Sequence, residues 1–294
     1  MTIKLVAMDM DGTLLNHQDH ITKDTMDALM KAQEKGVILA LASGRSYGRL
    51  MDYAKLLKLS EYNGFLIEVN GMAIYDLKKS ERTVFKRLVK QDLKELYEFL
   101  EPKEVECQYV IDRGIFDYIP DRVRLIKEAY RKKNNIPDDF PWTGGTFKEM
   151  TDTRSGYPDL KYIKDVNEID CEINKICIVD QDVERINQIY LDLCDHFKER
   201  FWFGCTAPRW LECMPQGINK GTALHKLCLK LDIKPEEVLC FGDGENDIDM
   251  LNAVTYGIAM DNAMDSVKAI AYDVCDSNNN DGIAKALKKY KVID

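Results

Sequence analysis

Long apolar runs are missing from this sequence, and so are the cysteine spacings typical of secreted or zinc-binding proteins. The longest early apolar run covers residues 37–42, far short of the roughly 20 residues that cross a bilayer. The first eight residues lack the basic and apolar segments of a secretory signal. Nine cysteines without a Cys-x-x-Cys pair fit reduced thiols better than disulfides or a zinc site. We therefore expect a cytoplasmic protein with no membrane segment.

Proline and glycine are scarce as well, with 8 and 17 in 294 residues, which excludes a fibrous or disordered chain. Positive charge is also in deficit, because 41 lysines and arginines face 50 acidic residues and the net charge is −9. We therefore expect no non-specific binding to nucleic acid or to an anionic membrane. At this length, one large domain with an inserted module is the expected organisation.

The pattern of apolar residues predicts an α/β core built from both ends of the chain. Residues 3–8 and 37–42 indicate buried parallel strands, each followed by a helical stripe. The same alternation returns from residue 219 onwards, which predicts a parallel sheet covered on both faces. The dipeptide Asn70-Gly71, between two β-rich runs, predicts a hairpin.

The middle of the chain departs from this alternation. After about residue 83, amphipathic helices and short strands indicate an inserted α+β module. Within it, residues 134–168 contain several prolines and glycines without a clear period, which predicts a long irregular segment. Aromatic residues are dense across the module. We expect most of them to fill its core and one or two to line a substrate pocket.

Polar side chains follow three of the predicted core strands directly, at the edge of the sheet where α/β proteins bind ligands. Asp9 and Asp11 follow the first strand and point the same way if the chain stays extended. The hydroxyl of Ser43 and the loop amides at Gly44 follow the second strand and could hold an anion. Acidic and amide residues at 243–247 follow a later strand.

Together these groups suit phosphoryl transfer assisted by a divalent cation. Carboxylate oxygens from two strand ends match the oxygen-rich coordination that Mg²⁺ prefers. Lys220, the serine hydroxyl and the loop amides would surround a phosphoryl group. One carboxylate could then act as the nucleophile, giving an aspartyl-phosphate, while the other transfers protons.

Four segments resemble the motifs of the haloacid dehalogenase (HAD) superfamily, in the order of that family. They are Asp9-Met10-Asp11-Gly12-Thr13-Leu14-Leu15, Ser43-Gly44-Arg45, Lys220-Gly221-Thr222-Ala223-Leu224 and Gly242-Asp243-Gly244-Glu245-Asn246-Asp247. The insertion between the second and third motifs resembles the large α+β (type IIB) cap of the Cof-type phosphatases. Asn70-Gly71 with the strand that follows it, and Met260-Asp261-Asn262-Ala263, resemble linking and closing segments of the same branch. The resemblance covers the whole chain. It implies a Rossmann-like parallel-sheet core, residues 1–83 and 211–294, and a cap that sets substrate specificity, residues 84–210.

The resemblance implies a role for each matching residue. Asp9 would be the nucleophile and a Mg²⁺ ligand, and Asp11 would be the general acid/base and a ligand through its backbone carbonyl. Asp243 would be the third protein ligand of the metal, with Asp247 supporting the site. The phosphate would be held by Met10 through its backbone amide and by Ser43, Gly44, Lys220 and Asn246.

Other residues allow more than one interpretation. Arg45 could contact the substrate near the phosphate, or it could pair with a carboxylate of the core, and both interpretations remain open. We interpret His17 and His20 as solvated loop residues and not as a pair of metal ligands, because no further histidine or cysteine lies nearby in the sequence. Cys240, inside an apolar strand, is interpreted as a core thiol.

The expected function is a Mg²⁺-dependent phosphomonoesterase whose partner is a small-molecule phosphate ester, with sugar phosphates among the expected substrates. One alternative is a phosphomutase or phosphotransferase that uses the same phosphoenzyme, which the motifs cannot separate because only the acceptor differs. Another is a sensor that binds a phosphate ligand without turnover. A sensor would have no need for an acid/base two residues after the nucleophile. The oligomeric state is left open.

Overall fold

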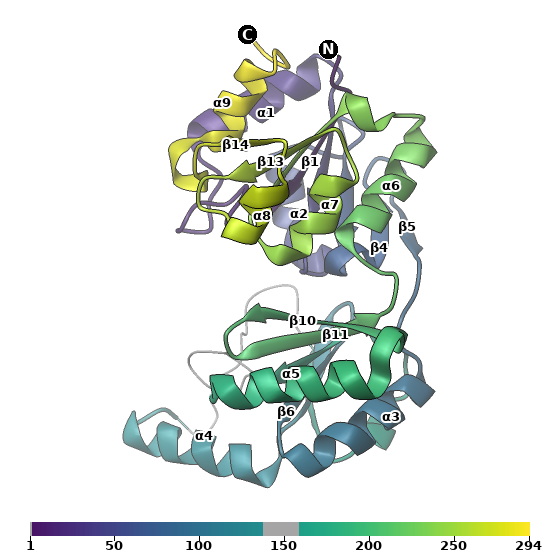
Figure 1. Cartoon of the computed structure of the whole chain (residues 1–294), viewed down its shortest axis with the longest axis vertical. Coiled ribbons are helices and arrows are strands. Elements are labelled where there is room, and N and C mark those ends of the chain that lie inside the picture. Colours follow the sequence, from purple (N-terminus) through teal and green to yellow (C-terminus); the bar gives the residue numbers. More distant parts are fainter. Residues whose placement is uncertain (1, 138–158) are drawn as a thin grey trace. The chain divides into compact units, whose positions relative to one another are not determined.

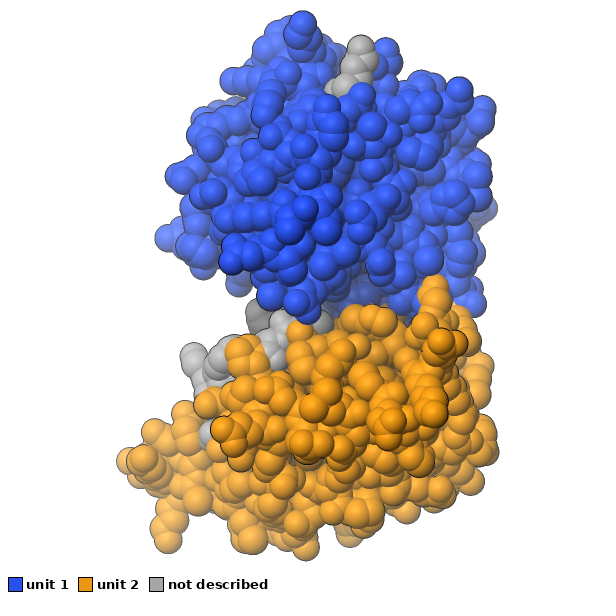
Figure 2. Space-filling view, in the orientation of Figure 1, with its two compact units in different colours: residues 1–85, 218–294 blue, residues 86–217 orange. Residues whose placement is uncertain are grey.

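The chain folds as two units, the second inserted into the first, in a computed structural model that describes residues 2–137 and 159–294. Unit 1 comprises residues 1–85 and 218–294, and unit 2 comprises residues 86–217. Figure 2 shows unit 1 in blue and unit 2 in orange. This is the predicted plan of a core interrupted by a module.

An eight-stranded sheet forms the centre of unit 1 (Figure 1). Six strands run parallel in the order β14-β13-β12-β1-β2-β3, and the sheet continues through β4 and β5 as antiparallel strands. In chain order the strands are Leu5–Asp9 (β1), Ile38–Ala42 (β2), Phe65–Glu68 (β3), Ala73–Asp76 (β4), Glu81–Val84 (β5), Val238–Gly242 (β12), Tyr256–Met260 (β13) and Asp273–Cys275 (β14). Every residue of β1 and β12 is buried, as their uninterrupted apolar sequences predict.

Helices cover both faces of this sheet, as predicted (Figure 1). On one face lie α1 (Lys23–Glu34), α2 (Tyr47–Leu56) and α9 (Gly282–Lys289), and on the other lie α6 (Lys220–Leu231), α7 (Ile248–Asn252) and α8 (Asp265–Ile270). The chain moves from β1 to β3 in one direction and from β12 to β14 in the other, so right-handed crossovers place their helices on opposite faces. The strand order therefore reverses between β1 and β12, the position at which α/β sheets bind ligands.

The predicted hairpin is present, although its connection is not a two-residue turn. Strands β3 and β4 pair in antiparallel fashion. A short 3-10 turn, Val69–Gly71, leads out of β3 and is fully buried.

Unit 2 is built on a six-stranded sheet in the order β10-β11-β9-β6-β7-β8, in which only β7 and β8 pair in parallel. Its strands are Glu106–Val110 (β6), Gly114–Tyr118 (β7), Asp159–Ile163 (β8), Lys175–Val179 (β9), Phe201–Ala207 (β10) and Trp210–Pro215 (β11). Its helices are Lys90–Leu100 (α3), Asp121–Lys133 (α4) and Val183–Phe197 (α5). Leucines and isoleucines of α3 and α5 join the sheet in one apolar core, which is the predicted α+β architecture.

Two predicted boundaries need correction. The predicted end of the cap after residue 210 would cut through β11, which pairs with β9 and β10 and keeps residues 211–215 in the sheet of unit 2. The chain therefore returns to unit 1 at Ile218, and it leaves unit 1 after Phe85 instead of after residue 83. The predicted irregular segment 134–168 includes a regular strand, β8, while its residues 138–158 lie outside the described residues.

A buried group of charged side chains lies within unit 2. Lys127 Nζ lies 2.7 Å from Glu106 Oε2, and both side chains are almost fully buried. Asp117 is fully buried as well. Burial raises the pKa of Asp117 well above its ordinary value, and the neighbouring Glu106 adds to this shift.

We expect Asp117→Asn to stabilise unit 2 at neutral and alkaline pH. The raised pKa of Asp117 means that the folded form binds the proton more tightly than the unfolded chain does. The stability that this group contributes is therefore fully present below about pH 4, and it is lost as the pH rises through the folded pKa. Asparagine stays neutral, so the variant's advantage in free energy of unfolding should grow as the pH rises.

Urea unfolding followed by tryptophan fluorescence measures this effect, because all three tryptophans, at positions 142, 202 and 210, belong to unit 2. Asp195→Asn, a change at an exposed position of α5, is the matched control and should show no such pH dependence. A difference between Asp117→Asn and the wild type that stays constant with pH would contradict the prediction.

Candidate active site

Two loops at the carboxyl ends of β1 and β12 bring three carboxylates together. Asp9 is the last residue of β1, Asp243 directly follows β12, and Asp247 ends a short 3-10 turn, Glu245–Asp247. One carboxylate oxygen from each lies within 4.8 Å of the others. Asp9 and Asp247 are buried, and Asp243 is partly buried. Asp9, Asp243 and Asp247, three of the four residues to which the resemblance assigned metal binding or metal support, therefore meet at the point where the strand order reverses.

The ammonium group of Lys220 lies between two of these carboxylates. Its Nζ donates to Asp9 Oδ1 at 2.5 Å and to Asp247 Oδ1 at 2.6 Å. The lysine opens α6, and the side chain of Asn219 caps that helix by accepting the backbone N–H of Thr222. Burial alone lowers the pKa of Lys220, but Asp247 and Asp9 more than offset this effect and raise it above its ordinary value. The two carboxylates therefore favour the protonated form of this buried lysine.

Hydrogen bonds fix the carboxylates of Asp243 and Asp247. Asp247 Oδ2 accepts the backbone N–H groups of Asp243 and Gly244, each at 3.0 Å. Thr13, to which the sequence analysis assigned no role, donates its hydroxyl to Asp243 Oδ1 at 2.6 Å. Gly12 has a φ of +84°, and a Cβ there would lie 2.3 Å from Asp243 Oδ2, so this position requires glycine.

The three carboxylates carry more negative charge than the lysine balances. Burial raises the pKa of Asp9 well above its ordinary value, an effect that Lys220 opposes and that Asp247 and Asp243 reinforce. Burial also raises the pKa of Asp243 to about 6, although the Thr13 hydrogen bond lowers it. When all are ionised, three carboxylates (−3) and one ammonium (+1) leave a net charge of −2. These oxygen donors and this charge fit a divalent cation.

Asp11 lies outside the cluster and pairs with Arg45. The guanidinium group of Arg45 donates to both carboxylate oxygens of Asp11, with Nε at 2.9 Å from Oδ2 and Nη2 bonded to Oδ1. The backbone of Arg45 is also held, because its N–H donates to Ser43 Oγ and its carbonyl accepts from Val69. The structure shows Arg45 paired with Asp11, a carboxylate of unit 1, and the interpretation of Arg45 as a substrate contact stays a prediction. The side chain of Asp11 is 54% exposed.

The predicted phosphate-binding residues lie around the same strand ends. Ser43 directly follows β2 and is buried, and Met10 lies between the two aspartates with its side chain in the core. Asn246 Nδ2 donates to Asn70 Oδ1 at 3.1 Å. A Cβ on Gly44 would lie 3.2 Å from that same oxygen, so the Asn70 side chain lies directly against Gly44. Sequence reasoning interpreted Asn70 as a turn residue, in a segment that resembles one of the family, and assigned it no contact in the site.

Comparison with known proteins identifies the family. A family model of haloacid dehalogenase-like hydrolases matches residues 6–287. The chain belongs to this family. The resemblance of the four motifs to the haloacid dehalogenase family is therefore confirmed, together with the Rossmann-like core and its inserted cap.

Relatives of this haloacid dehalogenase-like hydrolase include named phosphatases. The 5-amino-6-(5-phospho-D-ribitylamino)uracil phosphatase YcsE of Bacillus subtilis is 29% identical over 294 residues, covering 98% of this chain and 96% of the relative. The HMP-PP phosphatase of Yersinia enterocolitica is 30% identical over 273 residues, covering 90% and 86%. The crystal structure of a haloacid dehalogenase-like hydrolase from Bacteroides thetaiotaomicron superposes with a TM-score of 0.78 at 27% identity, covering 98% of this chain and 100% of the other.

Two asparagines near the end of the hydrolase chain hold the loop that follows Asp9, and sequence reasoning gave neither a role in the site. Asn262 Nδ2 donates to the carbonyl of Gly12, and Asn278 Nδ2 donates to the carbonyl of Leu15, both at 2.7 Å. The backbone N–H of Asn278 also donates to Asn262 Oδ1 at 3.0 Å. The one signal for Asn262 was its place in a segment, Met260–Ala263, that resembles a family motif.

The remaining predictions concern residues away from the carboxylates. His17 and His20 are exposed, as interpreted, and Cys240 is buried in β12. In the part of the chain that the structure describes, no helix combines the length and the apolar character needed to cross a membrane.

Proposed function

We propose that this hydrolase is a Mg²⁺-dependent phosphomonoesterase that acts on small phosphorylated metabolites, including sugar phosphates, through an aspartyl-phosphate on Asp9. The observation that carries the proposal is the position of Lys220, whose buried ammonium contacts Asp9 and Asp247 while Asp243 lies within 4.8 Å of both carboxylates. Such a site needs a divalent cation to balance its charge. It also keeps a fixed cation beside the carboxylate that would attack phosphorus.

The metal would be held by the carboxylates of Asp9 and Asp243 and by the backbone carbonyl of Asp11. Asp247 is better suited to supporting the metal site than to binding the metal directly. Both of its oxygens already accept hydrogen bonds, one from Lys220 and the other from two backbone amides. Mg²⁺ bound there would neutralise charge on the phosphoryl group and on the carboxylates.

The residues of the chain would perform two transfers in sequence. A carboxylate oxygen of Asp9 attacks phosphorus and the bond to the ester oxygen breaks. Asp11, released from Arg45 and protonated for this step, gives its proton to the leaving alkoxide. Asp11 then takes a proton from the water that attacks Asp9-phosphate, which releases phosphate and restores both carboxyl groups. Lys220, Ser43, Asn246 and the amides of Met10 and Gly44 would stabilise charge on the phosphoryl oxygens.

The substrate class is supported by the names of the relatives. Both enzymes named above are phosphatases of small phosphorylated compounds, and they match this chain along most of its length. A lysine and loop amides recognise a phosphoryl group without reading the rest of the molecule, so the site in unit 1 is compatible with many small esters.

Release of inorganic phosphate from a panel of small phosphate esters tests the proposal. We expect release from some esters in the presence of Mg²⁺, with a fall of roughly 100-fold or more in EDTA, because the carboxylates then lose their counter-charge. Restored activity on adding Mg²⁺ back is the control for unfolding. Activity that is unchanged by chelation would contradict the metal requirement.

The same panel separates the alternatives. Transfer of phosphate to a second sugar phosphate, in place of release, would indicate a phosphomutase or phosphotransferase. Binding of phosphate with no turnover of any ester would indicate a sensor.

A further inference from the structure

The turn Val69–Gly71 after β3 holds the backbone in a conformation that most residues avoid. Its three φ angles are +47°, +50° and +96°. A positive φ is uncommon for any residue with a side chain, and it is a strong outlier for β-branched Val69. Val69 and Asn70 are both buried, so this is not a loop that relaxes freely in water. The surrounding structure must hold the turn in place.

The turn contacts three of the four sequence motifs. The backbone N–H of Asn70 donates to the carbonyl of Ser43 at 2.9 Å, which ties the turn to the second motif. A Cβ on Gly71 would lie 2.1 Å from the carbonyl oxygen of Asn219 and 3.1 Å from the Cβ of Ala223, so the turn lies directly against the third motif. Asn70 Oδ1 accepts from Asn246 Nδ2 at 3.1 Å, which ties the turn to the fourth motif.

We infer that Asn70 is a positioning residue of the phosphate site and that it acts through Asn246. The inference rests on the proposed function, in which Asn246 holds the phosphate. The Nδ2 group of Asn246 has two hydrogens, and the bond to Asn70 directs one of them. The amide plane is then fixed, and the second hydrogen keeps one direction, which in the proposed site is toward the phosphoryl oxygens.

The residue type at position 70 follows from two separate requirements. The backbone needs a residue that tolerates a left-handed conformation, and Asn246 needs an acceptor within hydrogen-bond distance. Glycine meets the first requirement only, while most other polar residues meet only the second. Asparagine meets both, since it is among the few residues with a side chain that adopt this conformation readily.

Asn70→Gly therefore tests the contribution of the Asn70 side chain separately from that of the backbone. Glycine adopts the positive φ angle of this turn readily, so the backbone conformation is kept. We expect a folded protein whose inhibition constant for inorganic phosphate, measured with Mg²⁺, rises about 10-fold to 100-fold, with kcat/KM falling by a similar factor. Asn63→Gly is the matched control. Asn63 also lies in unit 1 with a φ of +59°, but it is exposed, and its substitution should change neither constant.

A double-mutant cycle with Asn246→Ala decides whether Asn70 acts through Asn246. In the Asn246→Ala background, Asn70→Gly should weaken phosphate binding by less than about twofold, because the group that it positions is gone. An equal effect in both backgrounds, or an Asn70→Gly variant that binds phosphate as the wild type does, would overturn the inference.

The outcomes also distinguish this inference from the proposed function. If the wild type binds phosphate but hydrolyses no ester, and Asn70→Gly weakens the binding, the inference stands and the phosphatase proposal fails. If the wild type hydrolyses esters and Asn70→Gly has the same inhibition constant and the same kcat/KM, the phosphatase proposal stands and the inference about Asn70 fails. A wild type that neither binds phosphate nor hydrolyses esters would overturn both.

Discussion

The Asp9→Asn variant is expected to hydrolyse phosphate esters at least about 10⁴-fold more slowly than the wild type. An amide is a far poorer nucleophile than a carboxylate, so the aspartyl-phosphate cannot form. The substitution also removes one charge from the group of three carboxylates and so weakens the proposed metal site. The measurement is release of inorganic phosphate from the best ester of the panel, at saturating Mg²⁺.

A matched control for this loss is Asp76→Asn. Asp76 is likewise a buried aspartate that ends a strand of the same sheet, but it accepts a hydrogen bond from the backbone N–H of Lys79 and lies outside the carboxylate group. Its substitution should leave turnover within about twofold of the wild type. Turnover by Asp9→Asn within about tenfold of the wild type would rule out the nucleophile role. Trapping of ³²P on the wild type but not on Asp9→Asn would support that role directly.

Lys220→Met is expected to cost both activity and stability. Methionine has nearly the same length, but it leaves Asp9 and Asp247 buried without the ammonium that contacts both of them. Removing one partner of a buried ion pair typically costs about 3–5 kcal/mol. Activity should fall by about 10³-fold or more, because the phosphoryl group also loses its fixed cation.

Mg²⁺ separates the two effects of Lys220→Met. A bound divalent ion supplies positive charge to the carboxylates, so Mg²⁺ should raise the melting temperature of this variant more than that of the wild type. It should not restore activity, because the cation that faces the phosphate is still missing. Differential scanning calorimetry with Mg²⁺ and with EDTA measures this contrast.

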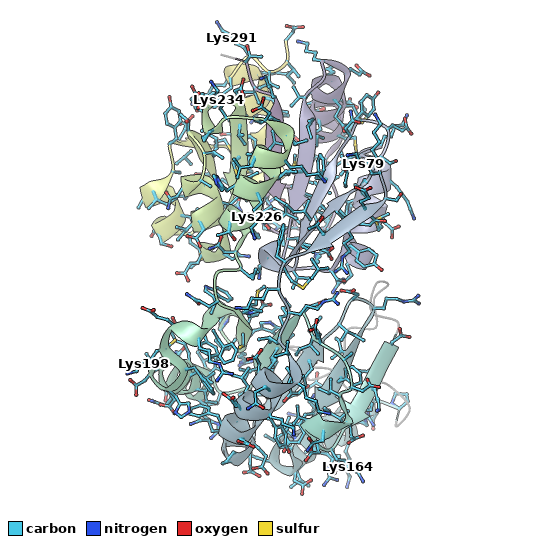
Figure 3. All side chains as sticks on the ribbon, turned by 90° about the vertical axis from the view of Figure 1, so that its right-hand side faces the viewer. Lys79, Lys164, Lys198, Lys226, Lys234 and Lys291 are labelled. Carbon is cyan, nitrogen blue, oxygen red and sulfur yellow. The ribbon has the colours of Figure 1, made fainter. Side chains whose placement is uncertain are left out.

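Lys226→Met is the matched control for Lys220→Met, because Lys226 is a second lysine on the same helix, α6 (labelled in Figure 3). Lys226 is an exposed residue and its ammonium lies over the ring of Phe85, so the loss of stability should stay below about 1 kcal/mol. A Lys220→Met variant that is as stable as Lys226→Met in EDTA would show that the buried carboxylates do not depend on Lys220.

Local sequence patterns were sufficient to predict the core sheet and the edge at which the site lies. Buried parallel strands have continuous apolar sequences, and short joints to helices place their carboxyl ends on one edge. The residues at the ends of these strands or directly after them, Asp9, Ser43 and Asp243, were therefore predicted to lie near one another. The same patterns were weaker in unit 2, where β8 falls inside a segment with no clear period.

By itself, the sequence determined the chemistry available to this hydrolase, its α/β core and the order of its four motifs, because these depend on residue type and on short-range periodicity. Only the tertiary structure decided the partners. It placed Arg45 on Asp11, Lys220 between Asp9 and Asp247, and Asn70 on Asn246. These contacts join residues 27 to 211 positions apart. Such partners depend on loop dihedrals and on the packing of distant elements, which no local pattern records.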